Sequence, residues 1–116
     1  MGFLNGKRAL ITGLISDRSI AYGIASAMKR EGASLAFTYQ GEKIKDRVAD
    51  LAKEFESDLV LPCDVGSDAE IDGLFSTLSQ HWDGLDAIVH SIAFVPKDAL
   101  AGDYLDSVTR EYFRIA

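Results

Sequence analysis

The sequence has little of what several classes of protein require. A single cysteine, Cys63, excludes an internal disulfide, and two histidines, His81 and His90, give few ligands for a metal site. Lysine and arginine form no block along the chain. There are 12 basic and 18 acidic residues, so the net charge of −6 gives no attraction to nucleic acid. We therefore expect a protein of the reducing cytoplasm that binds neither metal nor nucleic acid.

Long apolar runs are also absent. None approaches the about 20 residues of a membrane-spanning helix, and the start MGFLNGKRALITG lacks the basic and then apolar regions of a signal peptide. We expect no membrane partner. The composition, with 47% hydrophobic and 26% charged residues, is typical of an ordinary globular domain and argues against disorder.

The apolar residues that are present follow two alternating patterns. Short runs rich in Leu, Ile, Val and Phe predict buried parallel strands at residues 8–12, 34–39, 58–62 and 86–91. Helical periodicity predicts helices from an N-cap at Ser19 to about residue 31, across 44–55, across 67–82 and from near Asp106. Ser67 and Glu70 have the spacing of a capping box. This order predicts an α/β fold, a Rossmann-like doubly wound parallel sheet with ligands at the carboxyl ends of its strands.

The turn after the first predicted strand, TGLISDRSIAYG, lacks the usual fingerprint of dinucleotide-binding folds. That fingerprint has three glycines within six positions, whereas only Gly13 and Gly23 are present here. Gly13 still permits a tight exit from the strand. Ser19 and Ile20 place a hydroxyl and free amides at a helix N-terminus, where a pyrophosphate is stabilised. Because any βα turn can carry a glycine and a capping serine, the loop alone leaves phosphate binding open.

The longer stretch TGLISDRSIAYGIA resembles the cofactor loop of bacterial enoyl-acyl-carrier-protein reductases. This divergent branch of the short-chain dehydrogenase/reductase superfamily has Gly-x5-Ser-x-Ala-x-Gly in place of the glycine-rich pattern. The resemblance continues in register through EGASLAFTYQ, PCDV, HSIAF and GDYLDSVTREYF. It implies NADH-dependent reduction of the trans-2 double bond of enoyl thioesters carried on acyl carrier protein, in fatty-acid elongation, by a homotetramer.

By this resemblance, residues at the carboxyl ends of the strands bind the dinucleotide. The pyrophosphate and its ribose would contact Gly13, Ile15, Ser19 and Ile20. The adenosine ribose would contact Gln40, and the adenine would contact Asp64 and Val65. The nicotinamide end would contact Ser91, Ile92 and Ala93. Val95 matches a position that borders the acyl substrate. Many relatives have glycine where this chain has Ala93, so the added methyl narrows the pocket. Gln40 is neutral and favours NADH over NADPH, although Lys43 and Lys45 are close in sequence.

Structural roles compete with these functional ones. Asp64 could end its strand in an Asx-turn, Gln40 could be a solvated loop residue, and Val95 could pack in its loop. Cys63 at a strand end is more often a small buried hydrophobe than a nucleophile. His90 has no carboxylate identifiable beside it, so we expect a packed or hydrogen-bonded histidine rather than a base.

The catalytic pair of the family, a tyrosine and a lysine separated by six residues, is expected downstream of residue 116. Two pairs imitate reductase spacings, Tyr22 with Lys29 and Tyr39 with Lys43. The first lies on the phosphate-binding helix and the second at the adenosine end, so neither is expected to be catalytic. We interpret residues 1–116 as the N-terminal part of one dinucleotide-binding domain, and we expect this part to be inactive alone.

Two other functions are compatible with a doubly wound sheet. A ketone-reducing short-chain dehydrogenase would have Gly-x3-Gly-x-Gly and an Asn-Asn-Ala-Gly-like turn, where this chain has HSIAF. A phosphoacceptor receiver domain carries an aspartate after its third strand, where Asp64 stands. It also needs an acidic pair after its first strand, and Thr12 and Gly13 occupy those positions. Both alternatives are therefore disfavoured.

Overall fold

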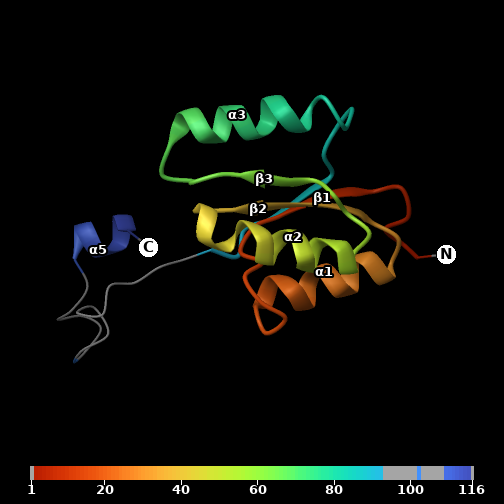
Figure 1. Ribbon diagram of the computed structural model, residues 1–116, viewed down its shortest axis with the longest axis horizontal. Helices are drawn as coiled ribbons and strands as arrows, with labels where there is room; N and C mark the ends of the chain where they lie inside the picture. Colours follow the sequence, from red (N-terminus) through yellow and green to blue (C-terminus); the bar gives the residue numbers. More distant parts are fainter. Residues whose placement is uncertain (1, 93–101, 103–108, 116) are drawn as a thin grey trace.

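A four-stranded parallel sheet with the strand order β3-β2-β1-β4 forms the centre of the fold. The computed structural model describes residues 2–92, 102 and 109–115. The strands are β1 (Arg8–Ile11), β2 (Ser34–Tyr39), β3 (Val60–Pro62) and β4 (Ala87–Val89). The helices are α1 (Ile20–Arg30), the 3-10 turn η1 (Glu42–Ile44), α2 (Lys45–Glu54), α3 (Asp68–Leu78) and α5 (Arg110–Ile115). Helices α1 and α2 cover one face of the sheet and α3 covers the other (Figure 1). This arrangement confirms the predicted α/β, Rossmann-like parallel sheet.

The two central strands are buried on both faces, which explains their nearly continuous apolar sequences. Successive side chains of β2 alternate between the two layers: Leu35 and Phe37 pack in the cluster under α1 and α2, whereas Ala36 packs in the cluster under α3. Leu10 of β1 also belongs to the α3 cluster. The residue range predicted for β2 is confirmed, and every residue of this strand after Ser34 is buried.

Small side chains bring α1 close to the sheet. Ala21 and Ala25 are its fully buried residues, and they pack in the same cluster as Phe37 and Val48. Phe55, the C-cap residue of α2, lies 5.6 Å from Phe37 between ring centroids. Complete burial of a large side chain such as Phe37 contributes about 1.5–3 kcal/mol. The cluster under α1 and α2 contains more buried residues than the cluster under α3, so it is the larger part of the core.

Several predicted boundaries were too wide. The third strand begins at Val60 rather than at residue 58, and the fourth covers three residues rather than 86–91. Helix α3 ends at Leu78, although its apolar pattern continues to Trp82. Trp82 still packs against the α3 cluster from the turn beyond the helix, so the periodicity continues without helical backbone. The last predicted helix corresponds to α5, which begins at Arg110. Its predicted start near Asp106 lies outside the described residues.

The loops that follow the strands bring the predicted site residues to one edge. Because all four strands are parallel, their carboxyl ends lie together, at the left of the sheet in Figure 1. The chain leaves β1 toward α1, β2 toward η1 and β3 toward α3 at this edge. We refer to it as the carboxyl edge. It is the position at which open parallel sheets bind their ligands.

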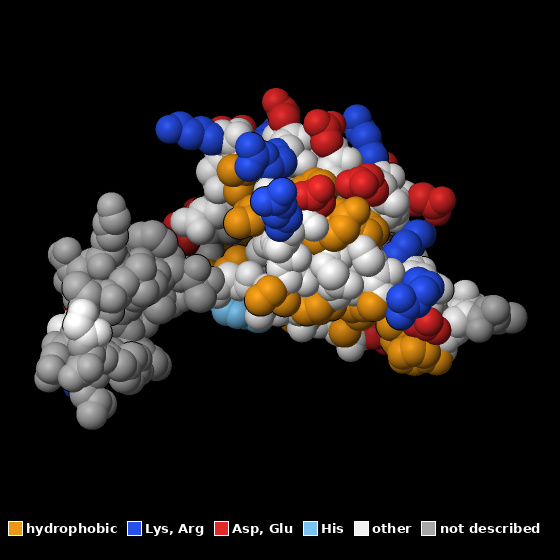
Figure 2. Space-filling model, turned by 90° about the horizontal axis from the view of Figure 1, so that it is seen from below, with side chains coloured by type: hydrophobic (Ala, Val, Ile, Leu, Met, Phe, Trp, Pro, Cys, Tyr) orange, Lys and Arg blue, Asp and Glu red, His pale blue; other side chains and the backbone are white. Residues whose placement is uncertain are grey.

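The surface mixes charges of both signs. On the face seen in Figure 2, lysine and arginine side chains alternate with acidic ones and with patches of apolar side chains. Among the helices in the described part of the chain, none has the length and apolar character needed to cross a membrane.

The C-terminus of α2 generates a prediction about stability. Glu56 has a φ of 57°, in the left-handed region that glycine adopts most readily after a helix. Its carboxylate pairs with Lys29 at 3.1 Å, but the exposed pair contributes little. We expect Glu56→Gly to raise the free energy of unfolding by about 0.5–1 kcal/mol, measured by urea denaturation. Glu56→Ala loses the same ion pair and keeps the strained backbone, so equal stabilities of the two variants would contradict this account.

Candidate functional site

A buried threonine joins the carboxyl ends of β1 and β4. Thr12 is only 5% exposed. Its backbone N–H and its hydroxyl both donate to the Val89 carbonyl, at 3.0 and 2.8 Å, and the hydroxyl accepts from the Ser91 N–H at 3.0 Å. The hydroxyl therefore fixes the backbone that leaves β4. Our sequence reasoning missed this role, although a polar residue ending a buried apolar run indicates that its hydroxyl has a partner.

Gly13 allows the two loops to approach each other. Its φ is 82°, and a Cβ at this position would lie 1.9 Å from the carbonyl oxygen of Ser91 and 3.2 Å from Cγ2 of Ile92. No side chain fits there. The structure thus brings together Gly13, Ser91 and Ile92, three of the predicted site residues. The need for glycine arises from this contact between loops.

The N-terminus of α1 leaves two amides without partners in the described part of the chain. Ser19 is the N-cap, as predicted: its Oγ accepts from the Tyr22 N–H at 3.3 Å and donates to the Ser16 carbonyl at 2.8 Å. The hydroxyl proton is therefore already engaged within the loop. The N–H groups of Ile20 and Ala21 have no acceptor among the described residues. These two amides, rather than the Ser19 hydroxyl, are the donors available to an anion.

Three predicted site residues expose large apolar side chains. Ile15 is 51% exposed, Ile20 75% and Val65 45%, and all three follow strands at the carboxyl edge. Leu14, next to Ile15, is fully buried. Exposed apolar side chains at a ligand-binding edge are suited to contact with the apolar faces of a ligand.

The loops after β2 and β3 provide polar groups. Gln40 is exposed and precedes Gly41, which has a φ of 88°. Asp64 is half-buried, and its Oδ1 accepts from the Gly66 N–H at 2.9 Å, so the Asx-turn considered from the sequence is present. Its Oδ2 has no hydrogen-bond partner among the described residues. The turn therefore leaves one carboxylate oxygen of Asp64 available to a ligand.

Cys63 is buried, as expected of a small apolar residue at a strand end. Burial is the main cause that raises the pKa of its thiol, and the carboxylates of Glu70 and Asp64 add to the effect. The reactive thiolate is therefore disfavoured. In the described part of the chain, no three His, Cys, Asp or Glu residues are grouped to hold a metal ion.

The expectation of a packed or hydrogen-bonded His90 was wrong. Its side chain is exposed and has no hydrogen-bond partner among the described residues. Ile88, two residues earlier and therefore on the same face of the chain, is 55% exposed. Helix α3 packs over β3, β2 and β1 and leaves this face of β4 uncovered within the described residues. Ala93 and Val95 lie outside the described residues.

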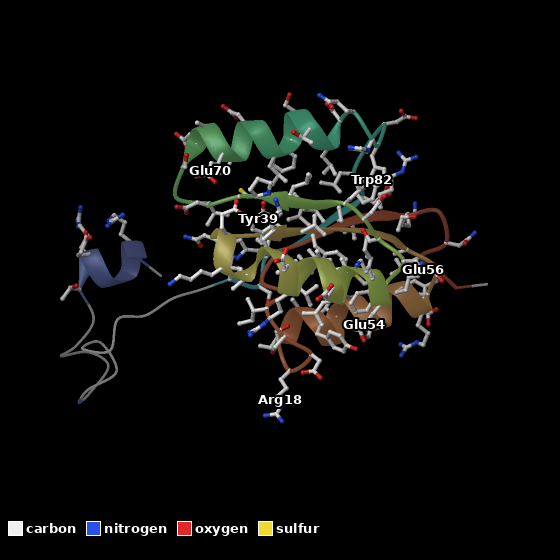
Figure 3. All side chains as sticks on the ribbon, in the orientation of Figure 1. Arg18, Tyr39, Glu54, Glu56, Glu70 and Trp82 are labelled. Carbon is white, nitrogen blue, oxygen red and sulfur yellow. The ribbon has the colours of Figure 1, made fainter. Side chains whose placement is uncertain are left out.

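The structure supports rejecting the two imitation catalytic pairs. The Tyr22 hydroxyl donates to Glu54 at 3.3 Å, and that carboxylate is the main cause that raises the pKa of the phenol. Lys29 pairs instead with Glu56, beyond the end of α2 (Figure 3). Tyr39 is buried in the core beneath α1 and α2. Tyr22, Lys29 and Tyr39 are thus each engaged in a structural contact.

Comparison with known proteins identifies the family. A family model described as enoyl-(acyl carrier protein) reductase matches residues 13–116. The chain belongs to this family. A relative from Neisseria meningitidis, enoyl-(acyl-carrier-protein) reductase (NADH), is 60% identical over all 116 residues. The chain spans 44% of the length of that relative. Membership of the reductase family excludes the receiver-domain interpretation of Asp64.

Solved structures of this reductase family have the same fold. The crystal structure of enoyl-(acyl-carrier-protein) reductase (NADH) from Aquifex aeolicus matches with a TM-score of 0.92 and 54% identity, covering 99% of this chain and 45% of that one. The reductase from Anaplasma phagocytophilum in complex with NAD matches with a TM-score of 0.88 and 38% identity, covering 98% and 44%. The Rossmann-like architecture is therefore shared with both proteins.

The threonine at the end of β1 generates a prediction. Thr12→Val keeps the shape of the side chain but removes the acceptor of the Ser91 N–H, so we expect the free energy of unfolding to fall by about 1–3 kcal/mol. Thr12→Ser keeps the hydroxyl and loses one methyl group, and we expect a fall of about 1 kcal/mol or less. Chemical denaturation followed by far-UV circular dichroism measures both. A valine variant as stable as the serine variant would show that the hydroxyl bridge contributes nothing.

Proposed function

We propose that residues 1–116 form the amino-terminal, dinucleotide-binding part of an NADH-dependent enoyl-acyl-carrier-protein reductase. The observation that carries the proposal is the pair of amides, of Ile20 and Ala21, that have no acceptor among the described residues at the N-terminus of α1 on the carboxyl edge. The relative from Neisseria meningitidis is named as an NADH enzyme, and the Anaplasma phagocytophilum structure was solved with NAD. The catalytic tyrosine and lysine of the family are proposed to lie outside this part.

The pyrophosphate would be held by the start of α1. The helix dipole and the two free amides favour a negative charge there, and each amide can donate one hydrogen bond to a phosphate oxygen. Gly13 lets the backbone pass close to the β4 loop, and Ile15 and Ile20 provide exposed apolar surface beside the amides. Ser19 would act mainly by capping the helix, since its hydroxyl proton is engaged by Ser16.

The two ends of the dinucleotide would lie along the same edge. At the adenosine end, Oδ2 of Asp64 would accept from the adenine amino group and Val65 would pack on the ring. Gln40 would meet the ribose, and its neutral side chain favours NADH over NADPH. At the nicotinamide end, we assign Ser91, Ile92 and Ala93. We assign Val95 to the border of the acyl substrate.

When bound, NADH would supply a hydride to the β-carbon of a trans-2-enoyl thioester, with protonation following at the α-carbon. What these residues contribute is binding and orientation. Thr12 and Gly13 hold the β4 loop, and the α1 amides would hold the phosphates. We further propose that the complete enzyme is a cytoplasmic homotetramer of fatty-acid elongation that acts on thioesters of acyl carrier protein and does not bind nucleic acid or membranes.

Binding of NADH to the chain is tested by fluorescence titration. Ser19→Asp and Ser19→Asn both keep a good N-cap residue, but only aspartate places a negative charge beside the α1 amides. We expect the aspartate variant to bind NADH at least about tenfold more weakly than the asparagine variant, which is about 1.4 kcal/mol. NADPH is expected to bind more weakly than NADH. Equal NADH affinities of the two variants would show that the phosphates do not bind at the start of α1.

The reaction is tested with a chimera in which residues 1–116 precede the remaining part of the Neisseria meningitidis relative. We expect the chimera to oxidise NADH in the presence of a crotonyl thioester, and the 116-residue chain alone to be inactive. An acetoacetyl thioester is the control substrate. Reduction of its ketone without reduction of the crotonyl double bond would favour the ketone-reducing dehydrogenase instead.

A further inference from the structure

The capping box predicted at the start of α3 forms only in part. Ser67 Oγ accepts from the Glu70 N–H at 3.3 Å, as expected. The carboxylate of Glu70, however, accepts from the Asp64 N–H at 3.1 Å and not from the Ser67 N–H, which donates to the Asp64 carbonyl at 2.9 Å. Glu70 therefore reaches back across six residues to the end of β3. Figure 3 shows Glu70 at the end of α3 that follows this strand.

This contact completes the restraint of Asp64. Its N–H donates to Glu70, its carbonyl accepts from Ser67, and its Oδ1 accepts from Gly66. Backbone and carboxylate are thus both fixed, and Oδ2 is left as the oxygen without a partner among the described residues. A side chain that is fixed before a ligand arrives loses less entropy on binding than a mobile one.

We propose that Glu70 is a positioning residue for the adenine end of the dinucleotide site. By accepting from the Asp64 N–H, it holds the turn after β3 in the arrangement that presents Oδ2 of Asp64 to the adenine amino group. The inference rests on the proposed function, because the adenine contact belongs to it. The proposal depends on the acceptor oxygen of Glu70, which a glutamine side chain also supplies, although the ionised carboxylate makes the stronger hydrogen bond.

The test compares Glu70→Ala, which removes the acceptor, with Glu70→Gln, which keeps a carbonyl oxygen. Asp72→Ala is the matched control, because it removes an exposed acidic residue from the same helix without contact to Asp64. Each substitution is made in the chimera. ADP binding is measured by titration calorimetry, and kcat and KM are measured with NADH and with reduced nicotinamide mononucleotide, which lacks the adenosine.

Loss of one hydrogen bond that fixes the site should weaken ADP binding and raise the KM for NADH by about fivefold in Glu70→Ala. We expect an unchanged kcat and an unchanged rate with reduced nicotinamide mononucleotide. Glu70→Gln should lie closer to the parent protein than Glu70→Ala does, and Asp72→Ala should match the parent protein. Gly66→Ala is a second, independent test of the restraint on Asp64, because the Cβ added at position 66 would lie 3.2 Å from Oδ1 of Asp64 and displace the same carboxylate. It should weaken ADP binding without a change in the mononucleotide rate.

Several results would overturn the inference. Parental ADP affinity in both Glu70→Ala and Gly66→Ala would show that the restraint of Asp64 does not act on adenine. A mononucleotide rate that falls together with the NADH rate would show a general structural role of Glu70. A Glu70→Gln variant as weak as Glu70→Ala would assign the effect to charge and not to the acceptor oxygen. A parent chimera that binds neither ADP nor NADH would instead refute the proposed function itself.

Discussion

The hydroxyl of Thr12 is the interaction on which the arrangement of the carboxyl edge depends. It connects β1 to the backbone that leaves β4, two segments separated by nearly 80 residues (Thr12 and Ser91 are 79 apart). Without it the Ser91 N–H would lose its acceptor in a half-buried position, which is costly. Gly13 makes the same contact possible by leaving no side chain between the loops. The Thr12 hydroxyl and the absence of a side chain at Gly13 thus set how closely the loops after β1 and β4 approach each other in the candidate site.

Most of the fold could be predicted from the sequence because its signals are local. The run 34–39 is apolar on both faces, and Ser19 and Ser67 are N-cap residues at the predicted positions. The end of α3 was missed because Trp82 continues the apolar pattern from a turn. The exposure of His90 was missed because it depends on which strand α3 covers, and strand order is not a local property.

The candidate site shows the same limit. Its residues could be named from a family resemblance, but their hydrogen bonds could not. The Ser19 hydroxyl is engaged by Ser16, which leaves the donors to Ile20 and Ala21. Glu70 is free to reach Asp64 because the Ser67 N–H is already bonded to the Asp64 carbonyl. Each assignment depends on which partner is already occupied, and spacing in the sequence does not contain that information.

The alanines of α1 link the core to the ligand-binding edge. Ala21 and Ala25 are fully buried against the sheet, so the separation between helix axis and sheet is set by two methyl groups. The free amides belong to the first turn of the same helix. A larger residue at either position would move the whole helix outward, and its first turn with it. The contacts of Ala21 and Ala25 with the sheet therefore set the position of the proposed anion site relative to the strand ends, so that interior volume and binding geometry cannot be varied independently.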